Sequence, residues 1–293
     1  RDYYASRGLG DVYKRQVYSD GTPFRVTAIN NVNISIEKGE FVGIIGHTGS
    51  GKSTLVQHLN GLLTPSSGEV LLDGKNINES KITRRQARFK VGLCFQYPEY
   101  QLFESTVYKD ISFGPKNMGL SEDEIDNRVK KAADFVGLKP DMLNKSPFDL
   151  SGGEKRRVAI AGVMAMEPEI LILDEPSAGL DPRGRDMIAE MISSYRKTTG
   201  STVIIVSHSM EDVAKSADKV LVMNKSEVEM FGTVNEVFSK VERLADIGLN
   251  VPQLTQIFLN LKHNGMAVRT DIYTIKNAEA ELLRLLREEG VLS

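Results

Sequence analysis

The sequence predicts an α/β fold built around a parallel sheet, and three observations lead to this prediction. Short, continuously apolar runs recur along the chain, namely "FVGIIG" (Phe41–Gly46), "EILILDEP" (Glu169–Pro176) and "TVIIVSH" (Thr202–His208). Such runs suit strands that are buried on both faces of a sheet. Segments with helical spacing of apolar residues lie between them, and a glycine-rich loop joins the first run to a helix. This alternation is typical of parallel α/β sheets.

The remaining elements follow from the same patterns. Further strands are expected at Val26–Ile36, "EVLLD" and "VGLCF", with a closing hairpin formed by "KVLVM" and "EVEMFG". Charged helical patterns replace buried strands after Phe238, so residues 17–238 are expected to form one domain and residues 239–293 a small helical appendage. Besides the helix after the glycine loop, helices are expected at Glu122–Val136, Glu154–Met166, Arg185–Lys197, Gln253–Asn264 and Asn277–Glu289.

Composition narrows the classes of function. The 293 residues carry 37 basic and 39 acidic side chains, a net charge of -2, so the basic surplus of nucleic-acid-binding proteins is absent and no nucleic-acid partner is expected. Cys94 is the single cysteine and lies in the apolar run "VGLCF", which indicates a buried thiol and a reducing cytosol. The apolar runs are far shorter than the roughly 18 residues that cross a bilayer. A role at a membrane would therefore require another chain.

The first 16 residues look foreign to the fold. "RDYYASRGLGDVYKRQ" (Arg1–Gln16) has no clear strand or helix period, and "DVYKRQ" is the translated end of a common transposase library adapter. We expect a non-native segment that replaced the natural start and its first strand, and we leave it out of the fold prediction. The alternative is a genuine polar tail, which a continuous reading frame in the source DNA would establish.

A phosphate-binding loop is the strongest motif. "GHTGSGKST" fits the pattern G-x-x-x-x-G-K-S/T and stands between a buried strand and a helix, the context that a P-loop requires. The glycines let backbone amides approach phosphate oxygens, Lys52 neutralises their charge, and the Ser53 hydroxyl is placed for Mg²⁺. The nucleotide contacts are therefore assigned to Gly46, His47, Thr48, Gly49, Ser50, Gly51, Lys52, Ser53 and Thr54.

Polar residues follow three of the buried strands and suggest the rest of a catalytic site. Asp174 and Glu175 end the strand "ILIL", at the edge where α/β sheets bind ligands. Asp174 is expected to hold Mg²⁺, and Glu175 to orient or deprotonate an attacking water. Gln96 can reach a metal and a neighbouring chain, and a neutral His208 can contact the γ-phosphate and that water. The alternatives are a solvated turn for the acidic pair and an ordinary histidine at a strand end.

A second anion-binding helix start lies about 100 residues after the P-loop. In "LSGGE", Ser151 is a good helix N-cap, and the glycines Gly152 and Gly153 leave backbone N–H groups free before Glu154.

Together these motifs resemble the ATP-binding cassette ATPases. The P-loop, Gln96, "LSGGE", "ILILDEP", "SAGLD" and His208 occur in that family's order and approximate spacing, over about Val17–Phe238. The resemblance implies a P-loop ATP-binding cassette fold, with an antiparallel β subdomain, a parallel sheet core, a helical subdomain at about 98–166 and ATP as the nucleotide.

The resemblance also explains the second anion site. In this family two cassettes face each other head to tail, so Ser151, Gly152, Gly153 and Glu154 are expected to cover the ATP of the partner cassette. Asp181 in "SAGLD" is expected to link the two sites. An aromatic residue stacks on adenine near the first strands, and the candidates are Tyr18 and, as an alternate, Phe24.

A narrower resemblance concerns the segment after Gln96. "FQYPEYQLFESTVYKDISFGP" and the C-terminal tail are similar to the second of the two paralogous ATPases of energy-coupling factor transporters, prokaryotic importers of vitamins and transition metals. This implies a second cassette, either a copy or a paralogue, a transmembrane coupling protein and a substrate-binding membrane subunit. It places the chain peripherally on the cytoplasmic face of the membrane. The alternatives are the ATPase of a conventional importer and a non-transport cassette.

The same segment is the candidate contact with the membrane subunits. "PEYQLFE" carries two carboxylates, Glu99 and Glu104, around the apolar and aromatic Tyr100, Leu102 and Phe103. This combination suits a partner helix that bears arginine, as the coupling protein of these transporters does by resemblance. The alternative is a solvated loop whose aromatic residues belong to the core of the helical subdomain.

Overall fold

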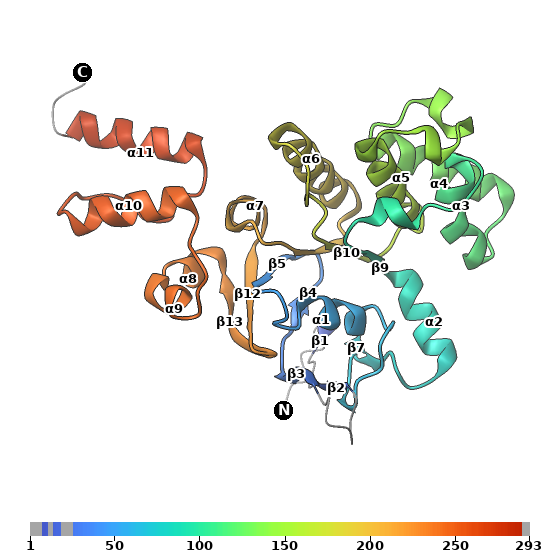
Figure 1. The fold of residues 1–293 in the computed structure, drawn as a ribbon, viewed down its shortest axis with the longest axis horizontal. Coiled ribbons are helices and arrows are strands. Elements are labelled where there is room, and N and C mark those ends of the chain that lie inside the picture. Colours follow the sequence, from blue (N-terminus) through green and yellow to red (C-terminus); the bar gives the residue numbers. More distant parts are fainter. Residues whose placement is uncertain (1–7, 11–13, 19–25, 289–293) are drawn as a thin grey trace.

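A mostly parallel sheet of six strands forms the centre of the molecule (Figure 1). The computed structural model of the chain describes residues 8–10, 14–18 and 26–288. The strand order is β13-β12-β5-β11-β10-β9, and only β13 runs antiparallel to its neighbour. The strands are β5 (Phe41–Gly46), β9 (Val91–Cys94), β10 (Ile170–Asp174), β11 (Thr202–Val206), β12 (Lys219–Asn224) and β13 (Glu227–Thr233).

Both faces of this sheet are covered, which is why its strands are continuously apolar. Alternate residues of β5 enter different cores, with Phe41 on one face and Val42 and Ile44 on the other. Residues of α1 (Lys52–Leu59) and α2 (Lys81–Lys90) contribute to the second core. The helices that contribute to the first are α3 (Val107–Met118), α4 (Glu122–Phe135), α5 (Gly152–Met164) and α6 (Pro182–Thr199). The predicted α/β class and parallel sheet core are thereby confirmed.

Two small antiparallel sheets pack beside the parallel one, as the cassette fold requires. Their strand orders are β4-β1-β7-β8 and β3-β2-β6. The elements are β1 (Gly8–Gly10), β2 (Lys14–Tyr18), β3 (Val26–Val32), β4 (Ile36–Glu37), β6 (Ser67–Gly68), β7 (Leu71–Leu72) and β8 (Lys75–Asn76).

Two short strands lie in the N-terminal segment that shows no clear strand or helix period. β1 pairs with β4 and β7, and Lys14 and Arg15 of β2 pair with Gly68 and Ser67 of β6. Strand pairing uses backbone groups that every residue except proline carries, so a segment without an apolar period can still join a sheet. The foreign origin of the segment stays a prediction.

The chain between Pro98 and Met164 forms helices joined by loops, with no strand, and lies over one end of the sheet (Figure 1). Its three α-helices begin at side-chain caps, because Thr106, Ser121 and Ser151 each accept a hydrogen bond from the backbone N–H three residues on. The elements are the 3₁₀ turn η1 (Pro98–Gln101), α3 (Val107–Met118), α4 (Glu122–Phe135), η2 (Pro140–Asn144), η3 (Pro147–Asp149) and α5 (Gly152–Met164).

The C-terminal helices lie at the opposite end of the molecule (Figure 1). After α6 (Pro182–Thr199), α7 (Met210–Ser216) and α8 (Val234–Phe238) come α9 (Val241–Asp246), α10 (Gln253–His263) and α11 (Ile275–Glu288). α10 and α11 enclose a small core of their own, which contains Phe258, Val268, Ile272 and Ala278. In the part of the chain that the structure describes, no helix is long and apolar enough to cross a membrane.

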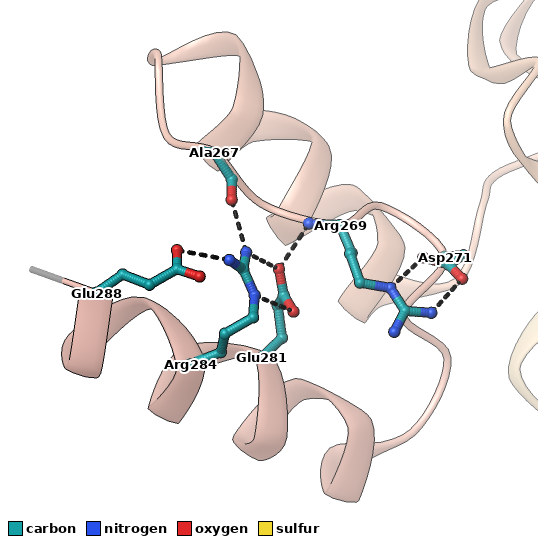
Figure 2. Close-up of polar contacts among 6 residues, drawn as sticks. All are labelled: Ala267, Arg269, Asp271, Glu281, Arg284 and Glu288. Atoms are coloured by element: carbon teal, nitrogen blue, oxygen red, sulfur yellow. Dashed lines mark hydrogen bonds and ion pairs between the residues drawn. The ribbon is translucent and has the colours of Figure 1, made fainter.

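A network of hydrogen bonds and ion pairs stabilises these C-terminal helices (Figure 2). The buried carboxylate of Glu281 accepts two hydrogen bonds from the Arg284 guanidinium and one from the backbone N–H of Arg269, at 2.7–3.1 Å. Arg284 also donates to Glu288 and to the carbonyl of Ala267. These bonds tie α11 to the loop that follows α10.

Candidate active site

The loop between β5 and α1 has a backbone that only glycine can adopt at two points. Gly46 and Gly51 have φ values of 148° and 100°, in the left-handed region. A Cβ at Gly46 would collide with the carbonyl oxygen of Met223, and one at Gly51 with that of Ala28. The predicted P-loop conformation therefore depends on close packing against β12 and β3.

Lys52 is held across this loop. Its Nζ atom donates hydrogen bonds to the carbonyl oxygens of Gly46 at 2.6 Å and His47 at 2.9 Å, and the residue is only 6% exposed. Burial lowers the pKa of Lys52, while the nearby carboxylates of Glu175 and Asp174 oppose that change. The positive charge is thus fixed at the head of α1, beside the two acidic residues.

The two carboxylates stand at the end of β10, as predicted. Glu175 has a φ of 51°, and its N–H donates to the carbonyl of Val206 at 2.9 Å. Burial, together with the charge of Asp174, raises the pKa of Glu175 to about 7. The Nε2 atom of His208 lies 3.3 Å from Oε1 of Glu175, without the alignment of a hydrogen bond. Burial and the charge of Lys52 lower the pKa of His208, which favours its neutral form near pH 7.

One cavity of about 420 Å³ gathers most of the predicted site. It contains every predicted catalytic and metal-binding residue, and it adds Thr27, Ala28 and Val206, which the motifs did not indicate. Thr27 and Ala28 lie in β3 and Val206 ends β11, in two different sheets, and no local sequence pattern could have marked them. The predicted residues in its wall are Thr48, Gly49, Gly51, Lys52, Ser53, Thr54, Gln96, Asp174, Glu175 and His208.

The oxygen donors in the cavity suit a hard divalent cation. Ser53, Asp174 and Gln96 offer a hydroxyl, a carboxylate and an amide oxygen, the ligand types that Mg²⁺ prefers. Burial raises the pKa of Asp174, and a hydrogen bond from Ser53 opposes that change, so the two side chains adjoin. Among the described residues, no cluster of three His, Cys, Asp or Glu side chains could hold a metal.

The other predicted nucleotide contacts lie outside this cavity. Gly46, His47 and Ser50 line two neighbouring hollows that separate the P-loop from the C-terminal helices. The side chain of Tyr18 and the whole of Phe24 fall outside the described residues, so the adenine contact stays a prediction.

The "LSGGE" helix start is capped as predicted, at the beginning of α5. Ser151 and Glu154 form a capping box, in which the Glu154 carboxylate accepts from the Ser151 N–H at 2.8 Å. A Cβ at Gly152 or Gly153 would meet nothing within 4 Å. None of the four residues lines the cavity.

The structure gives Glu99 a partner within the chain, and its predicted contact with a membrane partner stays a prediction. Both oxygens of Glu99 are bound by Arg156 of α5, at 2.7 and 3.1 Å, and its side chain is 14% exposed. Arg156 stands 57 residues further along the chain, so only the tertiary fold reveals this pair.

An apolar groove of about 480 Å³ lies beside this pair, between η1, α3 and α5. Tyr100 and Phe103 are 85% and 59% exposed, which contradicts the alternative that both belong to the core. Asp110 borders the groove, and its Oδ1 accepts from the N–H groups of Phe103 and Glu104 at 3.2 and 3.3 Å. Its Oδ2 is buried and has no hydrogen-bond partner among the described residues.

The fold and the cavity define a nucleotide-binding cassette of the P-loop type. The ABC transporter family profile matches residues 29–178. The chain is 57% identical over 275 residues to the energy-coupling factor transporter ATP-binding protein EcfA2 of Clostridium perfringens, covering 94% of this chain and 96% of that protein. It is 53% identical over 271 residues to the EcfA2 protein of Caldanaerobacter subterraneus, covering 92% of this chain and 95% of that protein.

Solved structures agree with these relatives. CbiO1 from Clostridium perfringens, part of the ABC transporter complex cbiONQ, superposes with a TM-score of 0.71 and 40% identity, covering 87% of this chain and 99% of that one. The ADP- and phosphate-bound dimer of the cassette MJ0796 gives a TM-score of 0.69 with 28% identity, covering 76% and 98%.

The chain therefore belongs to the ABC transporter family and, within it, to the energy-coupling factor transporter ATP-binding proteins. The predicted family resemblance, the cassette fold and the assignment as an ATPase are confirmed. These relatives favour the energy-coupling factor type over a conventional importer ATPase or a non-transport cassette.

Proposed function

We propose that this chain binds ATP with Mg²⁺ in the cavity at the P-loop and hydrolyses it to drive a membrane import complex of the energy-coupling factor type for vitamins or transition metals. The observation that carries the proposal is the convergence of Lys52, Asp174, Glu175, Gln96 and His208 on one cavity. The names of the relatives support the transport role.

Different residues bind the phosphates, accept the proton of the attacking water and orient that water. Lys52 and the backbone N–H groups at the start of α1 bind the β- and γ-phosphates, because a helix N-terminus and a fixed ammonium both favour anions. Glu175 accepts a proton from the attacking water, since a carboxyl that titrates near pH 7 is matched to that task. His208, neutral and 3.3 Å from Glu175, orients the same water and the γ-phosphate.

The donor set of Ser53, Asp174 and Gln96 would hold Mg²⁺, which neutralises phosphate charge when bound. Because Asp174 adjoins Ser53, the two side chains are already placed on one side of the cavity. Gln96 follows β9 and leads directly into the segment that borders the apolar groove. A shift of Gln96 would therefore displace the residues of that segment.

A second cassette completes the site. Ser151, Gly152 and Gly153 are open on this chain's surface and absent from its own cavity, which supports their contact with the ATP of a head-to-tail partner. The cassette MJ0796 is dimeric with ADP and phosphate bound, which supports a dimer of cassettes by similarity.

The apolar groove is the proposed contact with the transmembrane coupling protein. An arginine-bearing helix would bury its apolar face against Phe103 and Tyr100 and present its charge to Asp110, whose Oδ2 lacks a partner, with Glu104 close by. The complex would hold the chain peripherally on the cytoplasmic face of the membrane.

Two substitutions test the hydrolysis proposal. Lys52→Ala should weaken ATP binding about 10- to 100-fold, because a charge-assisted contact is lost. Glu175→Gln should bind ATP normally, yet release phosphate roughly 10²- to 10⁴-fold more slowly. The two measurements are equilibrium binding of ATP and phosphate release by the dimer. Near-normal turnover of Glu175→Gln would remove this residue from the catalytic role.

A further inference from the structure

Arg156 joins three functional segments through one buried guanidinium. It lies in α5, five residues after Ser151, and is 3% exposed. Its Nε and Nη2 atoms donate to the two oxygens of Glu99 in η1, at 3.1 and 2.7 Å. Its Nη1 atom donates to the carbonyl oxygens of Pro176 at 3.3 Å and Ala178 at 2.6 Å.

Each of these contacts leads to a different functional surface. Pro176 and Ala178 belong to the turn directly after Glu175, and the N–H of Ala178 donates to the Glu175 carbonyl at 3.1 Å. Glu99 lies in the segment that leads to the exposed Tyr100 and to the apolar groove. The guanidinium, in the helix that begins with "LSGGE", therefore links the turn after Glu175 to the segment that leads to the groove.

The geometry of the hydrogen bonds made by Arg156 restricts movement of the segments that carry its acceptors. A guanidinium is planar, and its donors have fixed directions, so the fork to Glu99 and the bonds to two carbonyls cannot be kept if one segment rotates against another. Burial would raise the pKa of Glu99, but the hydrogen bonds and charge of Arg156 hold it below its usual value. Separation would also leave a buried charge without compensation, which is strongly unfavourable.

We propose that Arg156 is a positioning residue that transmits the nucleotide state from the turn after Glu175 to the segment 97–104 beside the groove. The proposal rests on the proposed ATPase function. A nucleotide that orders the turn at Pro176 and Ala178 shifts their carbonyl oxygens, Arg156 follows its acceptors, and Glu99 follows Arg156. The surface offered to the membrane partner thus changes with the occupancy of the cavity.

Hydrogen exchange measured by mass spectrometry tests this link on the intact chain, with and without a non-hydrolysable ATP analogue and Mg²⁺. The peptide 46–54 reports nucleotide binding, and the peptide 97–104 reports transmission. In the wild-type protein, the analogue should slow exchange in both. In Arg156→Lys, which keeps the charge but loses the fork, the effect at 97–104 should fall about 2- to 30-fold, while the effect at 46–54 remains.

Two further variants make the result specific. Glu99→Gln keeps the size of the side chain and leaves the bonds to Pro176 and Ala178 possible, so it should reduce transmission even if Arg156→Lys folds poorly. Arg128→Lys is the matched control, because Arg128 also binds a carbonyl and carboxylates in the helical segment but touches neither functional turn. It should behave as the wild type.

The possible outcomes separate the two proposals. The transmission role is overturned if 46–54 is protected but 97–104 does not respond in the wild type. It is also overturned if 97–104 responds in Arg156→Lys and Glu99→Gln as strongly as it does in the wild type. A loss of response in Arg128→Lys as large as that in Arg156→Lys would reduce Arg156 to a general structural contact and would also overturn it. If the wild type shows no protection at 46–54, the ATPase proposal itself fails, and this inference fails with it.

Discussion

The Nε2 atom of His47 in the P-loop lies 2.7 Å from the carbonyl oxygen of Ile247, at the end of α9. Because a carbonyl only accepts, His47 must carry its proton on Nε2 to make this bond. The contact spans 200 positions of sequence and joins the phosphate-binding loop to the C-terminal helices. A Cβ at Gly248 would lie 3.0 Å from the same ring nitrogen, so the histidine is seated closely against this turn.

This contact predicts that the C-terminal helices stabilise the P-loop. His47→Ala should raise the Kd for ATP about 2- to 10-fold, because one hydrogen bond that orders the loop before binding is lost. His47→Gln keeps an N–H donor and should bind nearly as the wild type does. His263→Ala, at the exposed end of α10, is the control. Equal affinities of His47→Ala and His263→Ala, measured by titration with ATP, would show that the loop needs no support from α9.

The sequence predicted the elements whose local pattern is strong. β5 matches the expected strand residue for residue, and α10 differs from its expected range by one residue, because an apolar run or an apolar stripe defines each. α3 was missed because Gly114 and Pro115 lie inside it and obscure its period. α2 was missed because its residues are mostly polar and only Ala87 is buried.

At the site, too, only residues in a continuous sequence motif could be predicted. The P-loop and the pair Asp174–Glu175 could be predicted, since each motif is continuous in sequence and follows a buried strand. The pair between Glu99 and Arg156 could not be predicted, because an acidic residue in a loop gives no sign of a partner in another helix. Non-local pairs of this kind are fixed by packing, and a single sequence carries no local record of them.

The network in Figure 2 predicts a pH-dependent contribution to the stability of the appendage. Glu281→Gln should lower the free energy of unfolding by about 2 kcal/mol near pH 7, because a buried carboxylate that accepts three hydrogen bonds loses its charge. Glu279→Gln, on the exposed side of α11, should change little. Urea unfolding followed by circular dichroism measures both variants.

The sign of the pH dependence follows from the pKa of Glu281. Hydrogen bonds from Arg284 are the largest cause that holds this pKa below its unfolded value of 4.5. The stabilisation is therefore fully present above pH 4.5 and is lost as the pH falls through the lower folded pKa. A difference between wild type and Glu281→Gln that grew on acidification would contradict this assignment.

Because the start of α5 is exposed, we predict that Ser151 acts on the ATP bound by the partner cassette. Ser151→Arg should leave ATP binding at this chain's own P-loop unchanged, while phosphate release at the partner's site falls about 10²-fold, because the donors over that ATP are blocked. Ser121→Arg is a matched control, since it also removes the N-cap of a helix in the same helical segment, at a cost of about 1 kcal/mol. Mixing each variant with the wild-type partner separates the two sites. Lost ATP binding at the variant's own P-loop would place the motif in cis.

Asp110 predicts a conflict between stability and assembly. Burial raises the pKa of its carboxyl, against the opposing hydrogen bonds from Phe103 and Glu104, so the folded state binds its proton more tightly than the unfolded state does. Stability therefore falls as the pH rises from 3.8 through the folded pKa, and ionised Asp110 is a cost to the isolated subunit near neutrality. Asp110→Asn should raise Tm by roughly 1–3 °C at pH 7, a gain that disappears below the unfolded value. Asp123→Asn, exposed on α4, should leave Tm unchanged.

The same variant should assemble less well with its membrane partner. The buried Oδ2 of Asp110 has no hydrogen-bond partner in the described part of the chain, and an arginine entering the apolar groove would supply one together with a compensating charge. Asp110→Asn keeps the acceptor for Phe103 and Glu104 but offers no charge, so the fraction of coupling protein that co-purifies should fall while Tm rises. Thermal unfolding of the subunit and co-purification from membranes measure the two effects on one protein. Higher Tm with undiminished assembly would mean that the arginine pairs elsewhere, whereas lower Tm would show that the carboxylate serves the subunit's own fold.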